Sequence, residues 1–245
     1  MLEITLKSVG ASGGGIFLPV DYRGGFLSIV KRAISSESSI EYDLIFGRRS
    51  VKPYTFAVTF GEEIKVEDDK IFFTRPIEFK FSSFEPKYEI YVYNYFVKNK
   101  SIEIYGHSFE VSSIKLKRKK EISEPKALFK TLSPVLIRSH KNEKFYLCPK
   151  CENFDGDADF DEALKFNLRE QVSNLLCKSF NGEVKLEPVN LRRVIVKHMI
   201  NRGALKMPGF TGLFYLYAEP EILNLVNLAG LGSRRGQGFG MIDIV

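Results

Sequence analysis

A glycine-rich stretch near the C-terminus of the 245-residue chain reads Gly230-Leu231-Gly232-Ser233-Arg234-Arg235-Gly236-Gln237-Gly238-Phe239-Gly240. Glycine allows positive φ angles and close backbone approach, and successive backbone N–H groups can bind a phosphate. Arg234 and Arg235 add cationic, bidentate donors. The stretch therefore predicts a phosphate-binding loop, whose other binding residues are Gly230, Gly232, Ser233, Gly236, Gln237 and Gly238. The alternative is a glycine-rich turn that only packs the last strand.

The sequence around this loop excludes three nucleotide-cofactor motifs. No Gly-Lys-Ser or Gly-Lys-Thr occurs, so a GxxxxGK[ST] phosphate loop is absent. A dinucleotide fingerprint follows a strand and opens a helix, whereas this stretch follows a predicted helix (220–229) and precedes only a short strand (239–245). A kinase glycine loop would need a catalytic domain after it. A loop that contacts a phosphate backbone remains.

Hydrophobic periodicity predicts the elements that precede the loop in the second half of the chain. Residues 159–179 form an amphipathic helix with an apolar stripe, and Asp159 is its expected N-cap. Strands are expected over residues 129–138, 144–147, 183–200 and 210–218.

The first half shows the same order of elements. Residues 2–9 alternate as a strand, a helix after Pro19 ends at residues 35–39, and residues 54–60 form a strand. Residues 64–73 and 76–84 are expected as the arms of a hairpin with a turn at Asp68-Asp69. A helix over residues 85–98 and two short strands within residues 101–119 follow.

Together these patterns predict an α+β protein of two tandem ferredoxin-like (RRM-like) domains. Each domain is expected to be a βαββαβ unit with an antiparallel sheet. A basic run over residues 115–120 precedes a boundary at residues 121–126. We therefore expect an N-terminal domain over residues 1–122 and a C-terminal domain, containing the glycine loop, over residues 126–245.

The composition favours a polyanionic partner. Lys plus Arg total 36 and Asp plus Glu total 30, which gives a net charge of +6 and a pI near 9.0. The sequence has no apolar run of membrane-spanning length and no signal-peptide core at its start. Its three cysteines form no disulfide framework. These features predict a cytoplasmic location, no membrane partner and no cofactor; the Cys148-Pro149-Lys150-Cys151 motif would need two further ligands to hold zinc.

Residues 230–241, a Gly-Leu-Gly start and a Gly-Phe-Gly-Met end around a basic middle, resemble the C-terminal signature of the CRISPR repeat-processing endoribonucleases. These proteins belong to the repeat-associated RNA-binding (RAMP) superfamily. Further motifs similar to that family occur in the right order along nearly the whole chain: Leu18-Pro19 before the first helix, Pro53-Tyr54-Thr55-Phe56, Leu132-Ser133-Pro134-Val135 and the helix over residues 220–229.

The resemblance implies a tandem ferredoxin-like fold and cleavage of precursor CRISPR RNA within its repeats, without a metal. In such a reaction the ribose 2′-OH attacks the adjacent phosphorus and leaves a 2′,3′-cyclic phosphate. Repeat RNA, single-stranded or in a hairpin, is the implied partner. Other CRISPR effector subunits and a second copy of the chain, as a homodimer, are further candidate partners.

The candidate catalytic residues also come from the resemblance. Many family members carry a His between the first helix and the Phe-Thr-Phe strand, but alignment on residues 53–56 puts Phe46 near that position. The family Tyr falls near Lys31, with Tyr22 a few residues upstream, and Lys52 lies close to the family Lys. Either these remaining groups carry the reaction, or this member is slow or inactive.

Four further arginines are candidate RNA-binding residues: Arg48, Arg49, Arg192 and Arg193. The runner-up function is a non-catalytic RNA-binding or scaffold subunit of a CRISPR effector complex that uses the same loop. A third hypothesis is an unrelated RNA-binding protein. His107 and His140 are expected at the surface, and His198 in a strand.

Overall fold

The structure is a computed structural model that describes residues 1–245 except 10–15, 48–49, 62, 143–144 and 201–202. The side chains of residues 198–200, which include His198, and of residues 203–204 are also outside the description. Predictions for Arg48 and Arg49 therefore lie outside the described residues. None of the helices in the described part is long and apolar enough to cross a membrane.

The first half forms a five-stranded antiparallel sheet in the order β3-β6-β1-β8-β7. Four of its strands and two helices make one βαββαβ unit: β1 (Leu2–Ser8), α1 (Arg23–Glu37), β3 (Tyr54–Thr59), β6 (Ile77–Ser83), α3 (Pro86–Lys98) and β8 (His107–Leu116). β7 (Ser101–Ile104) extends the sheet beyond β8.

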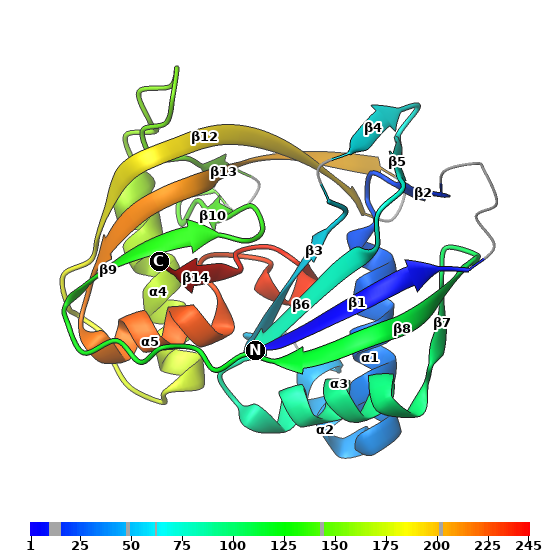
Figure 1. The fold of residues 1–245 in the computed structure, drawn as a ribbon. Coiled ribbons are helices and arrows are strands. Elements are labelled where there is room, and N and C mark those ends of the chain that lie inside the picture. Colours follow the sequence, from blue (N-terminus) through cyan, green and yellow to red (C-terminus); the bar gives the residue numbers. More distant parts are fainter. Residues whose placement is uncertain (10–15, 48–49, 62, 143–144, 201–202) are drawn as a thin grey trace.

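The second half repeats this topology in a four-stranded antiparallel sheet with the order β12-β13-β9-β14. Its elements are β9 (Lys126–Thr131), α4 (Phe160–Leu175), β12 (Lys185–Ile200), β13 (Gly203–Tyr217), α5 (Pro220–Ala229) and β14 (Ile242–Ile244). The tandem ferredoxin-like fold is confirmed. Figure 1 shows β12 and β13 arching from this sheet toward a small sheet of the first half, where Lys197 Nζ lies 2.6 Å from an Asp69 carboxylate oxygen.

The structure also contains elements that periodicity did not predict. α2 (Ser39–Phe46) begins immediately after α1, because Ser38 takes an extended backbone and its hydroxyl accepts a hydrogen bond from Glu41 N–H. The serines expected to end a helix therefore also cap a second one. β2 (Ile16–Pro19) pairs with β5 (Lys70–Phe73), which pairs with β4 (Ile64–Glu67) in the small sheet.

The predicted hairpin is partly wrong. The turn at Asp68-Asp69 is confirmed, with φ angles of 49° and 58° between β4 and β5. The second expected arm, however, is β6, which pairs with β1 and β3 in the main sheet. The β4–β5 hairpin is thus an insertion in the connection from β3 to β6.

Phenylalanines make up much of the core of the first half, where Phe26, Phe56, Phe79, Phe81 and Phe96 are fully buried. In the second half, the predicted stripe of α4 packs inward. Asp159 lies at the N-cap of α4 but makes no capping hydrogen bond; its carboxylate accepts one from Lys141 Nζ at 2.7 Å.

The segment between the domains is fixed by buried polar contacts. Lys119 is almost fully buried, and its ammonium donates hydrogen bonds to the carbonyl oxygens of Asn227 and Ile242. The Asn224 side chain bonds both the N–H and the carbonyl of Ile122. Lys117 pairs with Asp243 at 2.9 Å. Within the basic run, Lys119 is therefore turned inward and joins the two domains, whereas Lys117 is half exposed.

The buried Lys119 should make the free energy of unfolding depend on pH. Burial lowers its pKa from 10.5 to about 8, so between these pH values the unfolded chain binds more protons than the folded one. The free energy of unfolding should therefore rise with pH in this window, by roughly 3 kcal/mol. The free energy of unfolding, measured with denaturant at several pH values, should lack this rise in Lys119→Met and keep it in Lys117→Met. If the free energy changes with pH equally in the wild type and in Lys119→Met, Lys119 is not a buried charge.

Candidate functional site

The glycine loop, residues 230–240, is wedged between the two domains. A Cβ atom on Gly238 would lie 2.5 Å from the Phe56 ring, and one on Gly230 would lie 2.9 Å from Thr55 Cβ. A Cβ on Gly236 would lie 2.7 Å from Lys52 Cγ. These glycines are required because strand β3 and Lys52, two residues before it, approach the loop backbone closely.

The loop amides are largely occupied by the protein itself. The N–H groups of Gly230, Leu231, Ser233, Gln237, Gly238 and Gly240 donate to protein carbonyl oxygens. These six donors cannot also cradle a phosphate, and the packing alternative describes them. Phosphate binding by the rest of the loop stays a prediction.

Arg23, at the start of α1, anchors the loop and was not singled out by the sequence. Its Nε donates to Gly238 O at 3.2 Å, and its guanidinium lies 4.5 Å from the Phe239 ring centroid and 4.6 Å from that of Tyr22. Thr55 Oγ1 donates to Phe239 O at 3.0 Å. No sequence signal distinguished this buried arginine from exposed ones.

The two loop arginines have different roles. Arg235 is 6% exposed and donates to Ala229 O at 2.9 Å, and burial lowers the pKa of its guanidinium. Arg235 therefore stabilises the loop. The prediction had placed it at the surface as a donor to RNA, but the structure buries it. Arg234 is half-buried, with φ of 56°; its Nε donates to Tyr146 Oη at 2.6 Å and its Nη1 to Gln237 Oε1 at 2.8 Å. Arg234 and Gln237 remain at the surface side of the loop.

Lys31 and Lys52 come together on one aromatic ring. Their ammonium groups lie 5.2 Å and 5.6 Å from the ring centroid of Phe46, the last residue of α2. Lys52 also donates to the carbonyl oxygens of Ile45 and Ser50. Because Gly236 packs on the Lys52 side chain, this lysine pair adjoins the glycine loop.

The environment of Lys52 is electropositive. Burial, and then the charge of Lys31, lower the pKa of its ammonium. Neither cause is a carboxylate, so the pair keeps an attraction for an anion such as a phosphate group. A lowered pKa also makes the ammonium a better proton donor.

Tyr22 does not join the lysine pair. It precedes the first residue of α1 and is nine residues before Lys31, which places it about 13 Å away along the helix axis. Its ring packs edge-on against Phe60, at 4.7 Å between centroids, and burial raises the pKa of its hydroxyl. The prediction that Tyr22 acts with Lys31 and Lys52 is not supported by this geometry.

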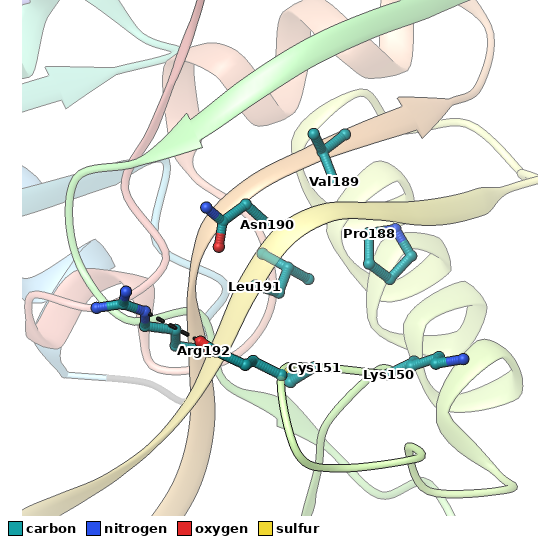
Figure 2. Close-up of a pocket in the computed structure, with 8 residues that line it drawn as sticks. Lys150, Cys151, Pro188, Val189, Asn190, Leu191 and Arg192 are labelled. Carbon is teal, nitrogen blue, oxygen red and sulfur yellow. Dashed lines mark ion pairs between the residues drawn. The ribbon is translucent and has the colours of Figure 1, made fainter.

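Arg192 and Arg193 lie on β12 and contact a different segment. Arg192 Nε is 3.4 Å from a Glu152 carboxylate oxygen, the ion pair marked in Figure 2, beside a groove of about 550 Å³. The Arg193 guanidinium lies 4.3 Å from the Phe154 ring centroid. Both arginines pack on the 148–154 segment, and their RNA binding stays a prediction.

The described cysteine and histidine side chains pack singly or in pairs. Cys148 and Cys151 are buried, and burial raises the pKa of the Cys148 thiol to about 12. His107 packs edge-on against Phe17, and His140 Nε2 lies 3.4 Å from Glu162. In the part of the chain that the structure describes, no group of three or more His, Cys, Asp or Glu side chains is arranged to hold a metal ion.

The arrangement of two ferredoxin-like domains is shared with solved structures of CRISPR-associated and RAMP proteins. The fold is similar to that of the product of a Cas6-related gene from Pyrococcus furiosus, with a TM-score of 0.84, 19% identity and coverage of 100% of this chain and 97% of that one. An RAMP protein binding different RNA substrates matches with a TM-score of 0.79 and 20% identity, covering 100% and 98%. A Cas6 product complex matches with a TM-score of 0.67 and 13% identity, covering 100% of this chain and 98% of that one.

The family follows from the sequence model of CRISPR associated protein Cas6, C-terminal, which matches residues 116–244, more than half of the chain. The chain belongs to the Cas6 family. No curated protein matches it. The matched region contains the glycine loop, whereas Lys31, Phe46 and Lys52 lie outside it.

The fit of the loop predicts a position-specific effect of added methyl groups. Gly238 and Gly106 both have positive φ, 86° and 78°, so Ala at either position should lose about 1 kcal/mol of stability to backbone strain. A Cβ at Gly106 meets no atom within 4 Å, whereas one at Gly238 meets the Phe56 ring. We expect the free energy of unfolding in urea to fall by roughly 1–3 kcal/mol more for Gly238→Ala than for Gly106→Ala. Equal losses would show that the Phe56 ring moves aside and that the packing against Gly238 is not tight.

Proposed function

We propose that this chain binds CRISPR repeat RNA and cleaves it without a metal ion, by attack of the 2′-OH on the adjacent phosphorus. Membership of the Cas6 family supports CRISPR RNA processing. Similar folds include an RAMP protein binding different RNA substrates and a Cas6 product complex. The observation that carries the proposal is the Lys31–Lys52 pair at Phe46, beside the glycine loop.

The lysine pair suits the charge that this reaction develops. As the 2′ oxygen bonds to phosphorus, negative charge accumulates on the phosphorane oxygens, and both ammonium groups can stabilise it. The Lys52 ammonium donates to Ile45 O, Ser50 O and Ser50 Oγ, and it must release one of these acceptors to give a proton to the departing 5′ oxygen. The proton of the 2′-OH passes to solvent. The products are a 2′,3′-cyclic phosphate and a 5′-OH, and Arg234 contacts a neighbouring phosphate.

A second candidate function is RNA binding without cleavage. Phe46 occupies the place between the two lysines and has no ionisable group, and Tyr22 lies at the far end of α1. A site without a base loses the proton-transfer contribution, typically about 10²–10⁴ in rate. The same cationic surface would then hold the repeat RNA for a larger CRISPR complex.

One assay separates these functions. The full chain is incubated in EDTA with end-labelled repeat RNA, both as a single strand and as a hairpin. Cleavage at one position with a cyclic-phosphate end supports the endoribonuclease. Tight binding with intact RNA supports the second function, and the absence of binding at low salt contradicts both.

Replacing the lysine pair tests its role directly. We expect Lys31→Met plus Lys52→Met to lower the single-turnover cleavage rate by about 10²–10³, because the phosphorane loses both cations. For single-stranded RNA, the slope of log affinity against log salt should fall by about 0.7 for each lost phosphate contact. Lys65→Met is the matched control, since Lys65 is an exposed lysine on β4; a double variant that cleaves and binds like this control would remove the pair from the site.

A further inference from the structure

An aromatic surface lies on the C-terminal domain beside the glycine loop. The rings of His140 and Phe166 face each other with centroids 5.9 Å apart and an interplanar angle of 33°. His140 follows β10 (Ile137–Arg138), and Phe166 lies on α4. Phe166 is 45% exposed, so a large part of this ring meets solvent.

Hydrogen bonds hold this ring pair in place against the loop. Asn167, the neighbour of Phe166, donates to Arg138 O at 2.8 Å. Its side-chain oxygen accepts a hydrogen bond from Ser233 Oγ at 2.5 Å. The helix that carries Phe166, the strand before His140 and the loop that carries Arg234 are therefore joined through one asparagine.

Two cationic groups lie near a third ring of the same domain, that of Tyr146. The guanidinium carbons of Arg138 and Arg234 lie 5.8 Å and 5.9 Å from the centroid of the same ring, that of Tyr146. Arg138 is two residues before His140, and its carbonyl oxygen accepts the hydrogen bond from Asn167, the neighbour of Phe166. Charge for a phosphate and a flat apolar face thus belong to segments that this asparagine joins.

The fold itself does not require an aromatic side chain at position 166. The buried face of α4 consists of Phe160, Ala163, Leu164, Leu168, Gln171 and Val172, and Phe166 is not among them. The Glu162 carboxylate lies 3.4 Å from His140 Nε2. A carboxylate at this rim repels phosphate but accepts hydrogen bonds from the amino groups of bases, so the ring pair itself suits a base.

We propose that Phe166 and His140 form a platform on which one unpaired base of the bound RNA stacks, while Arg138 and Arg234 hold its phosphates. Aromatic side chains bind splayed-out bases in single-stranded RNA in this way. The inference rests on the proposed RNA binding. It adds that the bound RNA has an unstacked nucleotide next to the glycine loop.

The absence of tryptophan from the chain allows a direct test. Phe166→Trp in the full chain places a single fluorophore on the platform, and single-stranded repeat RNA is titrated against it. We expect quenching that saturates at the RNA concentration where independent filter binding saturates. Tyr93→Trp, a similarly exposed aromatic position on α3, is the matched control and should not be quenched. Inorganic polyphosphate, a polyanion without bases, should quench neither variant.

Affinity gives a second readout. Phe166→Ala should weaken RNA binding about tenfold, whereas Phe166→Trp keeps it, because stacking requires a ring. A thermal melt checks that Phe166→Ala remains folded. If RNA binds the Phe166→Trp protein without quenching, or Phe166→Ala binds like the wild type, the platform is refuted and the proposed function stands. If the wild type itself binds no RNA, the proposed function and this inference both fall.

Discussion

Contact between the loop backbone and strand β3 is the constraint on which the rest of the structure depends. The loop fits because Gly230, Gly236 and Gly238 have no Cβ where Thr55, Lys52 and Phe56 approach. The same fit turns Arg235 inward and leaves Arg234 at the surface side. It also places residues of the second domain beside the lysine pair of the first. Packing and the candidate site are therefore set by one interface.

Six of the loop amides donate hydrogen bonds within the protein, so much of the loop backbone serves packing. The candidate binding side chains lie at its margin: the Lys31–Lys52 pair of the first domain, and Arg234 with Gln237 of the loop itself. The candidate site is composite, since neither domain supplies it alone. Glycines can therefore indicate a candidate site in a sequence because they allow close packing beside it, without themselves contacting a ligand.

Much of the fold could be predicted from the sequence, because long amphipathic segments such as α4 have a clear period. The short α2 and β2 were missed, since each has too few residues to show a period and Ser38 is both a stop and a start signal. At the candidate site, the sequence indicated the glycine loop and the two lysines, but it could not indicate which side chains are buried. Arg234 and Arg235 are identical neighbours in sequence, and a left-handed backbone at Arg234, held by tertiary contacts, decides which one turns inward. Likewise the sequence could not show that Arg192 pairs with Glu152 and that Arg193 lies against the Phe154 ring.

The interface joins residues that are very distant along the chain. The Arg23–Gly238 hydrogen bond spans 215 positions, and the Thr55–Phe239 bond spans 184. Contacts of such high sequence separation form late, because closing a long loop costs entropy before any contact is gained. Each ferredoxin-like unit can first bury its own core as a separate folding unit. We therefore expect docking of the two units to be the slow step in the maturation of this chain, so that the composite surface exists only after both halves are complete.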